Sequence, residues 1–296
     1  MDHRKALFTG CAPAIVTPFR EGHLDEAAFL RLIERQFEGG CSALVVCGTT
    51  GESAALSEAE RYRLLCLAAQ TADKRIPVIA GAGSNDTNHA LRLIRIAEDA
   101  GADGLLLVTP YYNKTTQAGL LAHYSYLADR TELPILIYEV PSRTGVTIAP
   151  ETLAVLSRHP QIWGIKEAGT DLDRISSAIR QCDGDFCFYS GNDSLALPLF
   201  SLGGKGLISV ASNLLPKEFG TLCDLALHGK FAQAAEWHYR YLELMELLFS
   251  EVNPIPVKEA LGMMGLCSPE LRLPLVPMSE KNRRRLRACL AALHLL

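Results

Sequence analysis

A lysine closes a short apolar run whose composition is typical of a buried strand. The run is Ile-Trp-Gly-Ile-Lys at residues 162–166, and its only cation is Lys166. An amine at the end of a buried strand is poorly hydrated, which favours its neutral form. A neutral lysine can attack a carbonyl carbon and form a Schiff base. The same run also fits a lysine that extends from the strand end to solvent, and the segment alone does not separate the two.

Reactive side chains follow several other β-like runs of the chain. They lie in Gly-Thr-Thr-Gly-Glu at 48–52, Thr-Pro-Tyr-Tyr-Asn at 109–113, Tyr-Glu-Val-Pro-Ser-Arg-Thr-Gly at 138–145 and Ser-Gly-Asn-Asp at 190–193. Each segment alone has an ordinary explanation, such as a tight turn with a helix cap, a core tyrosine or a surface ion pair. A fold that brought all of these segments to one edge would favour a catalytic role over the separate structural roles.

Together with Lys166, these residues predict a carbonyl reaction on a small carboxylic acid. The turn at 48–51 could present backbone N–H groups and two hydroxyls to a carboxylate. Lys166 would attack the adjacent keto carbon, and the resulting iminium would let the neighbouring methyl group lose a proton and become an enamine. Tyr138 is the candidate proton carrier, in a relay with Thr49 and a second tyrosine. Arg143 offers a bidentate site for a second carboxylate.

Strand-like and helix-like segments alternate along the chain and predict how these residues are positioned. Eight β-rich runs are at 12–16, 43–46, 78–80, 104–108, 135–138, 163–166, 186–189 and 206–210. Helical periodicity separates them at 25–38, 57–72, 87–100, 117–130, 150–157 and 172–180. This pattern predicts an α/β fold of the (β/α)₈ TIM-barrel type, because an open dinucleotide-binding sheet would carry a Gly-x-Gly-x-x-Gly turn after its first strand. In a barrel, the carboxyl ends of the strands meet at the active-site face.

The strand pattern stops near residue 217 and gives way to helical patterns. The segments 218–250, 256–265 and 279–296 have helical spacing of apolar residues. We therefore predict a catalytic barrel over residues 1–224 and a C-terminal helical domain over residues 225–296.

Composition excludes several classes of partner. The 296 residues carry a net charge of −4, which provides no basic surface for nucleic acid or for an anionic membrane. No segment has the roughly 18 uncharged apolar residues of a membrane-spanning helix, and the first ten residues lack the apolar core of a signal peptide. Nine cysteines without a Cys-x-x-Cys pair and eight scattered histidines predict reduced thiols and give little support to a protein-bound metal. We expect a cytoplasmic enzyme.

The motifs resemble those of the dihydrodipicolinate synthase family, also called 4-hydroxy-tetrahydrodipicolinate synthases. The resemblance includes Asn-Pro-Ile-Pro-Val-Lys at 253–258 and runs from about residue 9 to the C-terminus. It implies a lyase of the pyruvate-dependent class I aldolase and N-acetylneuraminate lyase superfamily, without a cofactor. The implied reaction condenses pyruvate with L-aspartate 4-semialdehyde and closes a ring in lysine and diaminopimelate biosynthesis. A homotetramer, built as a dimer of dimers, is also implied.

The resemblance assigns roles to particular residues. Lys166 would form the Schiff base, and Tyr138, Thr49 and Tyr112 would form the proton relay, with Tyr112 supplied by the neighbouring subunit across the tight dimer interface. Pyruvate would contact Thr50, Gly191 and Ile208, and Arg143 would bind the carboxylate of the semialdehyde. The Pro-rich motif that contains Lys258 would start a C-terminal helix and have a structural role.

Two departures from the family pattern concern Glu139 and the regulatory site. Position 139 is Glu where the family often has Asn, and strand alternation from an inward Tyr138 predicts that Glu139 faces outward. Residues that resemble a lysine-binding site at the dimer interface are Ser53, Ala54, Asn85, Tyr111, Glu58, Arg61 and His89. Lysine-inhibited members of the family carry two histidines and a glutamate at the positions where this chain has Glu58, Arg61 and His89. We therefore expect weak or no inhibition by lysine.

Two other functions fit the same residues. One is a pyruvate-dependent aldolase or lyase that acts on a sugar acid or a keto-deoxy acid. Arg143 favours a second carboxylate over the hydroxyl groups of a sugar and so favours the synthase. The other is a barrel that binds a keto acid without catalysis, which the joint presence of the lysine, tyrosines, threonines and arginine disfavours.

Overall fold

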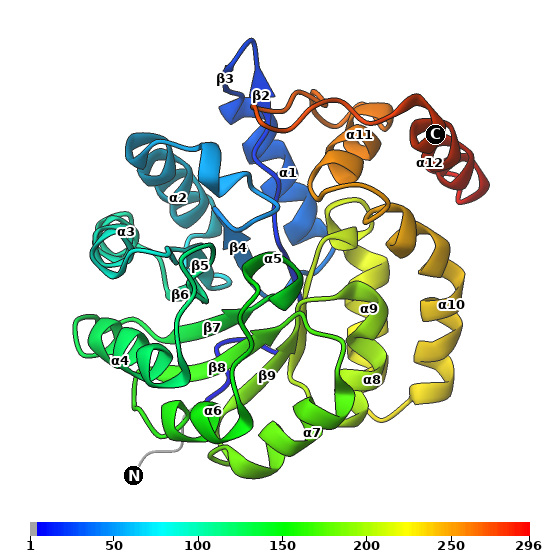
Figure 1. The fold of residues 1–296 in the computed structure, drawn as a ribbon. Helices are drawn as coiled ribbons and strands as arrows, with labels where there is room; N and C mark the ends of the chain where they lie inside the picture. Colours follow the sequence, from blue (N-terminus) through cyan, green and yellow to red (C-terminus); the bar gives the residue numbers. More distant parts are fainter. Residues whose placement is uncertain (1–4) are drawn as a thin grey trace.

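A computed structural model describes residues 5–296 as an eight-stranded parallel barrel surrounded by helices (Figure 1). The strands are β1 (Gly10–Pro13), β4 (Leu44–Val46), β5 (Val78–Gly81), β6 (Gly104–Val108), β7 (Ile135–Glu139), β8 (Ile162–Glu167), β9 (Cys187–Ser190) and β10 (Gly206–Ser209). Their order is β1-β10-β9-β8-β7-β6-β5-β4, and a bridge between Ala14 and Val45 joins the two ends. All eight predicted strands and the TIM-barrel fold are confirmed.

The helices that follow the strands form the outer ring in Figure 1. They are α1 (Glu26–Glu38), α2 (Glu58–Ala72), α3 (Thr87–Asp99), α4 (Gln117–Ala128), α6 (Pro150–Leu156), α7 (Leu172–Gln181), α8 (Ala196–Ser201) and α9 (Pro216–Leu227). Capping side chains define several starts: those of Asp25, Ser57, Asp86, Thr116 and Asp171 accept backbone N–H groups of the first turn. The six helices predicted between residues 25 and 180 are confirmed to within two residues at each end.

Short elements that the sequence did not predict lie in the connections. A two-stranded hairpin, β2 (Phe19–Arg20) with β3 (His23–Leu24), projects beyond the barrel. The turns η1 (Ser53–Ala55), η2 (Asp193–Leu195), η3 (Ala211–Asn213) and the short helix α5 (Pro141–Thr144) follow strands. All of them are too short to leave a periodic pattern.

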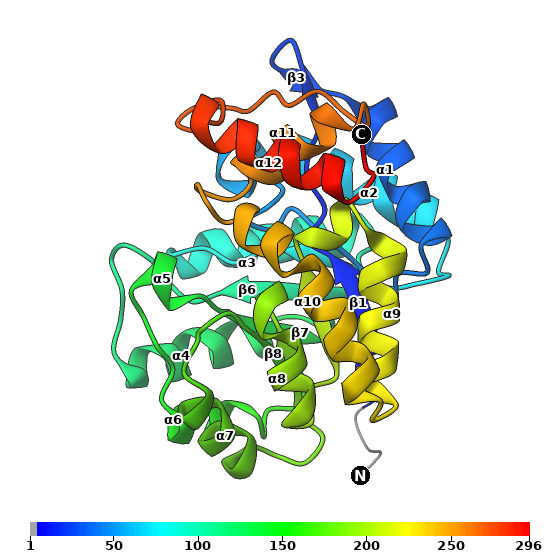
Figure 2. The same ribbon diagram turned by 90° about the vertical axis from the view of Figure 1, so that its right-hand side faces the viewer.

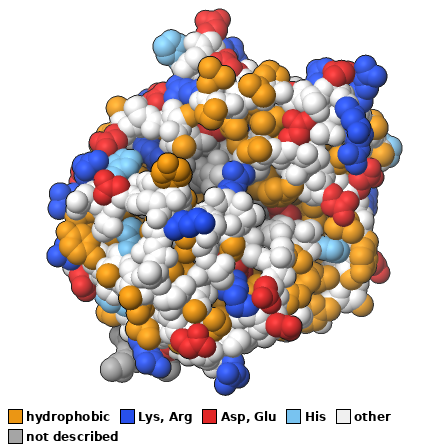
Figure 3. All heavy atoms as spheres, viewed as in Figure 1, with side chains coloured by type: hydrophobic (Ala, Val, Ile, Leu, Met, Phe, Trp, Pro, Cys, Tyr) orange, Lys and Arg blue, Asp and Glu red, His pale blue; other side chains and the backbone are white. Residues whose placement is uncertain are grey.

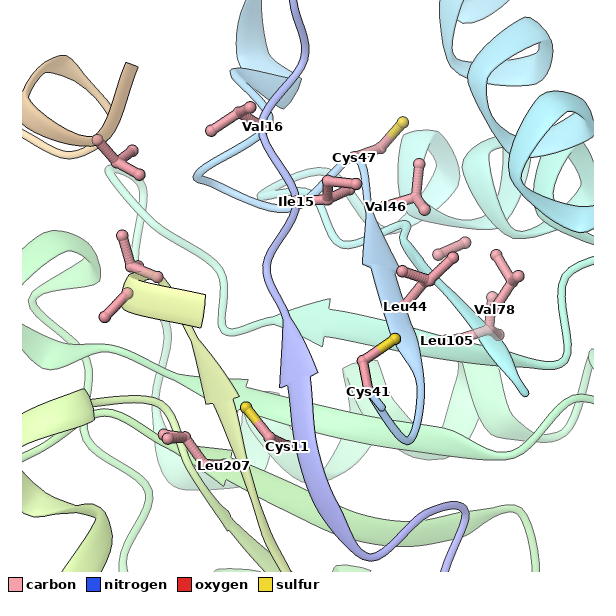
Figure 4. Packing of buried hydrophobic residues seen from close by; sticks show 14 of the residues in the cluster. Cys11, Ile15, Val16, Cys41, Leu44, Val46, Cys47, Val78, Leu105 and Leu207 are labelled. Atoms are coloured by element: carbon pink, nitrogen blue, oxygen red, sulfur yellow. The ribbon is translucent and has the colours of Figure 1, made fainter. Parts of the chain in front are cut away.

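Side chains of the strands alternate between two apolar layers. Ala12, Val45, Ile79, Leu106 and Ile208 belong to the cluster inside the barrel. Their neighbours along the strands belong to the larger cluster between barrel and helices, which Figure 4 shows for residues such as Cys11, Leu44, Val78, Leu105 and Leu207. This two-sided burial explains why the strands are continuously apolar. All nine cysteines are free, and six of them are buried.

The C-terminal helices pack beside one flank of the barrel (Figure 2). They are α10 (Phe231–Leu247), α11 (Ile255–Met263) and α12 (Glu280–Ala292). The helical segment predicted over residues 218–250 is two helices, because the chain turns at Gly229 with φ +72°, a conformation that favours glycine. The predicted boundary at residue 224 lies within α9, and the division into two domains stays a prediction. Within residues 5–296, no helix combines the length and apolar character needed to span a membrane.

Candidate active site

Lys166 and Tyr138 lie side by side at the carboxyl ends of two neighbouring strands. They are register partners in the parallel pair β7–β8, and Nζ of Lys166 is 4.2 Å from the centre of the Tyr138 ring. Their side chains are nearly buried, with 6% and 7% exposure. The strand alternation points both toward the barrel mouth. A potential nucleophile and a potential proton carrier therefore share one site.

A cavity of about 870 Å³ opens above this pair. Its lining includes Lys166, Tyr138, Thr50, Arg143, Gly191 and Asn253. Side chains from the end of α10 and the loop after it form another part of the wall, so the C-terminal helices complete the site. Figure 3, viewed as Figure 1, shows this face hollowed near its middle, with Lys and Arg side chains beside the hollow. The size is within the usual range for small-molecule sites.

Gly191 supplies the space that the lysine side chain occupies. It follows β9, and its N–H donates to the carbonyl of Glu167 at 2.7 Å. A methyl group at Gly191 would lie 2.9 Å from Cε and 3.1 Å from Cγ of Lys166. The methyl group would also lie 2.9 Å from Cβ of Ala168, so any larger residue would have to displace Lys166 or Ala168.

Arg143 and Thr50 are connected through Asn253. Nη2 of Arg143, on α5, donates to the backbone carbonyl of Asn253 at 3.0 Å. The Asn253 side chain donates from Nδ2 to Oγ1 of Thr50 at 3.0 Å, and within residues 5–296 its buried Oδ1 has no hydrogen-bond partner. The loop before α11 thus positions two predicted substrate-binding residues. Asn253 was not among the predicted site residues, although it lies in the motif at 253–258.

Thr49 lies in a second cavity next to the first. This cavity has a volume of about 380 Å³ and shares Val140, Arg143, Val252 and Asn253 with the larger one. Tyr111 also lines it. The structure therefore places Thr49 in the wall of the neighbouring cavity and not in the wall that contains Lys166 and Tyr138.

Tyr112 and Ile208 lie outside the walls of both cavities. Tyr112 has an exposure of 91%, and its backbone adopts the left-handed conformation with φ +65°, which is rare for a bulky residue. Ile208 is fully buried on β10, in the apolar cluster inside the barrel that also contains Tyr138. Neither position brings the side chain into contact with the cavity of one subunit.

A buried carboxyl group supports the end of β10. Asp193 accepts hydrogen bonds from the Ser209 hydroxyl and, at 3.0 Å, from the backbone N–H of Val210. Burial raises the pKa of Asp193, while these hydrogen bonds and the charge of Lys166 oppose the shift. Asp193 therefore connects the turn after β9 to the end of β10.

Glu139 faces away from the barrel axis, as predicted, and forms part of a buried cluster. Its Oε1 lies 2.9 Å from Nη2 of Arg174, and the same nitrogen lies 2.6 Å from Oε2 of Glu167. Burial, followed by the charge of Glu167, raises the pKa of Glu139 to about 8, although Arg174 opposes the shift. The predicted orientation is confirmed, but the sequence did not indicate the cluster.

The residues expected to form a regulatory site divide into two groups. Ser53, Ala54, Arg61 and Tyr111 line the smaller cavity. Within it, the Arg61 guanidinium donates to the carbonyls of Gly81 and Ser53, at 3.1 and 2.5 Å.

The remaining members lie outside that cavity's wall. Nε2 of His89 is 3.7 Å from Oε1 of Glu58, whose side chain is half exposed. The backbone carbonyl of Asn85 accepts a hydrogen bond from Asn113 at 2.9 Å. Across the described chain, no group of three or more His, Cys, Asp or Glu side chains is arranged to hold a metal ion.

Comparison with known proteins identifies the family. Residues 7–293 match the model of the dihydrodipicolinate synthetase family. A 4-hydroxy-tetrahydrodipicolinate synthase from Alkaliphilus oremlandii is 50% identical over 280 residues, which cover 95% of this chain and 97% of that protein. The crystal structure of dihydrodipicolinate synthase from Thermotoga maritima has a TM-score of 0.97 at 46% identity, with 98% and 100% of the two chains covered. A monomeric dihydrodipicolinate synthase variant has a TM-score of 0.96 at 47% identity, with 98% of each chain covered. The chain belongs to the dihydrodipicolinate synthetase family.

Proposed function

We propose that the chain acts as a 4-hydroxy-tetrahydrodipicolinate synthase, a lyase that condenses pyruvate with L-aspartate 4-semialdehyde and closes the product ring. The observation that carries this proposal is the contact of Lys166 with Tyr138 beneath a cavity that also contains Arg143. The name of the Alkaliphilus oremlandii relative supports the same reaction. The product would enter lysine and diaminopimelate biosynthesis.

The first step joins pyruvate to Lys166. The neutral amine attacks the keto carbon, and loss of one water leaves an imine. Thr50 contributes to binding because its Oγ1 already accepts a hydrogen bond from Asn253, which leaves its own O–H free to donate to the pyruvate carboxylate. Gly191, which has no Cβ, leaves Cγ and Cε of Lys166 unobstructed.

The second step makes and uses the enamine. The imine withdraws electrons from the methyl group of pyruvate, which loses a proton, and the new carbon nucleophile attacks the aldehyde carbon of the second substrate. Tyr138 is placed to carry protons in these steps because it lies beside Nζ. Thr49 and Tyr112 would connect this phenol to solvent. Since Tyr112 is exposed in one subunit, its contribution requires the neighbouring subunit.

Arg143 selects the second substrate by its charge. One of its N–H groups is used by the carbonyl of Asn253, and the remaining donors can bind a carboxylate in bidentate fashion. The semialdehyde retains such a carboxylate when its aldehyde faces the enamine. Its amine then attacks the imine carbon, and formation of the ring releases Lys166. Overall, one water is lost and no cofactor is required.

The working enzyme is proposed to be a cytoplasmic homotetramer. The left-handed backbone of Tyr112 directs an aromatic ring into solvent, and a partner subunit would cover it. Burial of this ring would offset part of the cost of its strained backbone. The pyruvate contact assigned to Ile208 would come from its backbone, because its side chain is buried inside the barrel.

Turnover of the two substrates tests the proposal. The purified protein is incubated with pyruvate and aspartate semialdehyde, and product is consumed by a reductase that oxidises a reduced nicotinamide. Lys166→Ala is the control. We expect turnover by the wild type and none by the variant. Absence of wild-type turnover, with cleavage of a sugar acid or keto-deoxy acid instead, would replace the synthase by another pyruvate-dependent aldolase.

A further inference from the structure

Three charged side chains meet directly behind the reactive ends of β7 and β8. Glu139 follows Tyr138 on β7, Glu167 follows Lys166 on β8, and the two glutamates are themselves register partners. Strand alternation sends them outward, where both are buried beneath α7. Arg174 of α7 reaches both, since its Nη2 lies 2.9 Å from Glu139 and 2.6 Å from Glu167.

The same cluster also ties down the loops that follow the two strands. The second oxygen of Glu139 accepts the backbone N–H of Ile148 at 3.0 Å, and that of Glu167 accepts the N–H of Gly169 at 2.7 Å. Nη1 of Arg174 donates to the carbonyl of Ile148 at 3.3 Å. Gly169 and Arg174 line the larger cavity, so the cluster extends from behind the strands to the cavity wall.

There is no spare room in this arrangement. A methyl group on Gly169 would lie 2.7 Å from Oε1 of Glu167 and 3.3 Å from Nη2 of Arg174. Two buried carboxyl groups that share one largely buried guanidinium, 14% exposed, are also costly to desolvate, and apolar side chains of similar volume would commonly stabilise a protein as well. Stability alone therefore does not account for three charged groups at this position.

We propose that Glu139, Glu167 and Arg174 form a clamp that positions Tyr138 and Lys166 for reaction, with one guanidinium holding both strand ends and both following loops. The clamp rests on the function proposed above, because that function makes these two residues the reacting pair. Arg174 and the two glutamates are positioning residues, and the chemistry stays with Lys166 and Tyr138.

Charge makes the clamp sensitive to pH. Two ionised carboxylates around one guanidinium would leave a net negative charge in a buried site, and burial accordingly raises the pKa of Glu139 to about 8. Glu139 is also approached by Tyr124 of α4, and Arg174 by Asp171 at the start of α7. When Glu139 ionises, it competes with Glu167 for Arg174. The end of β7 then shifts relative to β8, and turnover falls.

Two substitutions separate this clamp from ordinary packing. Arg174→Lys keeps a positive charge but loses the planar fork, in which one nitrogen reaches both carboxyl groups and the other reaches the Ile148 carbonyl. Arg180→Lys, on an exposed position of the same helix, is its control. Glu139→Gln keeps the volume and an acceptor oxygen but cannot ionise, and Glu151→Gln, exposed on α6, is its control. For each protein, kcat and KM are measured from pH 6 to about pH 9. The rate at which borohydride traps the pyruvate imine and the melting temperature are measured over the same range.

We expect Arg174→Lys to lower kcat by about 10- to 100-fold, the range for a small misplacement of reacting groups. Its effect on KM should be smaller. Arg180→Lys should change neither constant. Above pH 8, Glu139→Gln should retain more of its turnover than the wild type does. The turnover of Glu151→Gln should have the same pH dependence as that of the wild type. If Arg174→Lys does not fold, the pH profile of Glu139→Gln decides alone.

Profiles of Glu139→Gln and wild type that coincide at every pH would overturn the clamp. A wild type that traps pyruvate but does not turn over the semialdehyde would instead contradict the proposed function. In that case, the trapping rates of the same variants still test the clamp.

Discussion

Nζ of Lys258 lies 2.7 Å from Oε1 of Glu52, and both side chains are almost completely buried. The lysine also donates to the carbonyl of Thr17 at 2.9 Å, and the other oxygen of Glu52 accepts the backbone N–H of Arg272 at 3.0 Å. Glu52 directly follows the turn at 48–51. This ion pair therefore fastens the C-terminal helices to the loop that we assign to the pyruvate carboxylate.

Lys258→Ala should destabilise the protein, because it leaves the Glu52 carboxylate buried without its partner. Breaking one side of a buried pair typically lowers the free energy of unfolding by about 3–5 kcal/mol. Urea unfolding measures the change. The double variant Lys258→Met with Glu52→Gln removes both charges and should recover most of the loss. A single variant as stable as the wild type would show that the pair does not stabilise the C-terminal contact.

Gly191→Ala should slow adduct formation by at least about tenfold. The added methyl group would come 2.9 Å from Cε of Lys166, so the amine would have to move from its reactive position. Gly184→Ala is the control, because a methyl group there meets nothing within 4 Å. Both proteins should remain folded by circular dichroism. Equal trapping rates for the two variants would contradict the tight contact.

The stability of the protein should depend on the ionisation of Glu139. Its pKa rises from an ordinary 4.5 to about 8 in the folded chain, so the folded state binds more protons than the unfolded state between these values. The contribution of Glu139 to the free energy of unfolding therefore falls as the pH increases through this window.

Glu139→Gln removes that dependence. The melting temperature of Glu139→Gln minus that of the wild type should increase by several degrees from pH 5 to pH 8. Above pH 8 this difference should level off. Calorimetry at several pH values measures the difference. A constant difference between the two proteins across this window would contradict the assignment of the proton to Glu139.

Lysine should inhibit the enzyme weakly or not at all. The Arg61 guanidinium already uses donors on the carbonyls of Gly81 and Ser53, and it adds a positive charge to a site where a lysine ammonium would need an anion. Glu58 is an exposed carboxylate that lies near His89 and Arg92. Initial rates are measured against lysine concentration at fixed pyruvate. Strong inhibition at submillimolar lysine would contradict this expectation.

Most of the fold follows from patterns local in the chain. The barrel strands are apolar runs buried on both sides, and the helices start at capping residues such as Ser57 and Asp171, so both are visible in the sequence. The β2–β3 hairpin was missed because each strand has two residues. The break between α9 and α10 was missed because a single residue, Gly229, makes the turn.

The candidate site was predictable where a residue stands at a strand end. Lys166, Tyr138 and Gly191 are examples, because barrel geometry brings strand ends together wherever they occur in sequence. Asn253 and Arg174 reach the site from a distant loop and from a helix, so their contacts depend on tertiary packing that no local pattern encodes. Tyr112 is 91% exposed in the single chain, so its part in the relay stays a prediction.

The mass of the peptide that contains Lys166, after treatment with pyruvate and borohydride, tests the central claim most directly. Reduction of the imine leaves a stable carboxyethyl group on the amine. We expect this added mass on Lys166 only when pyruvate is present, and we expect none in Lys166→Ala. A modification located on another lysine, or no modification in a folded protein, would contradict the assignment of Lys166 as the nucleophile.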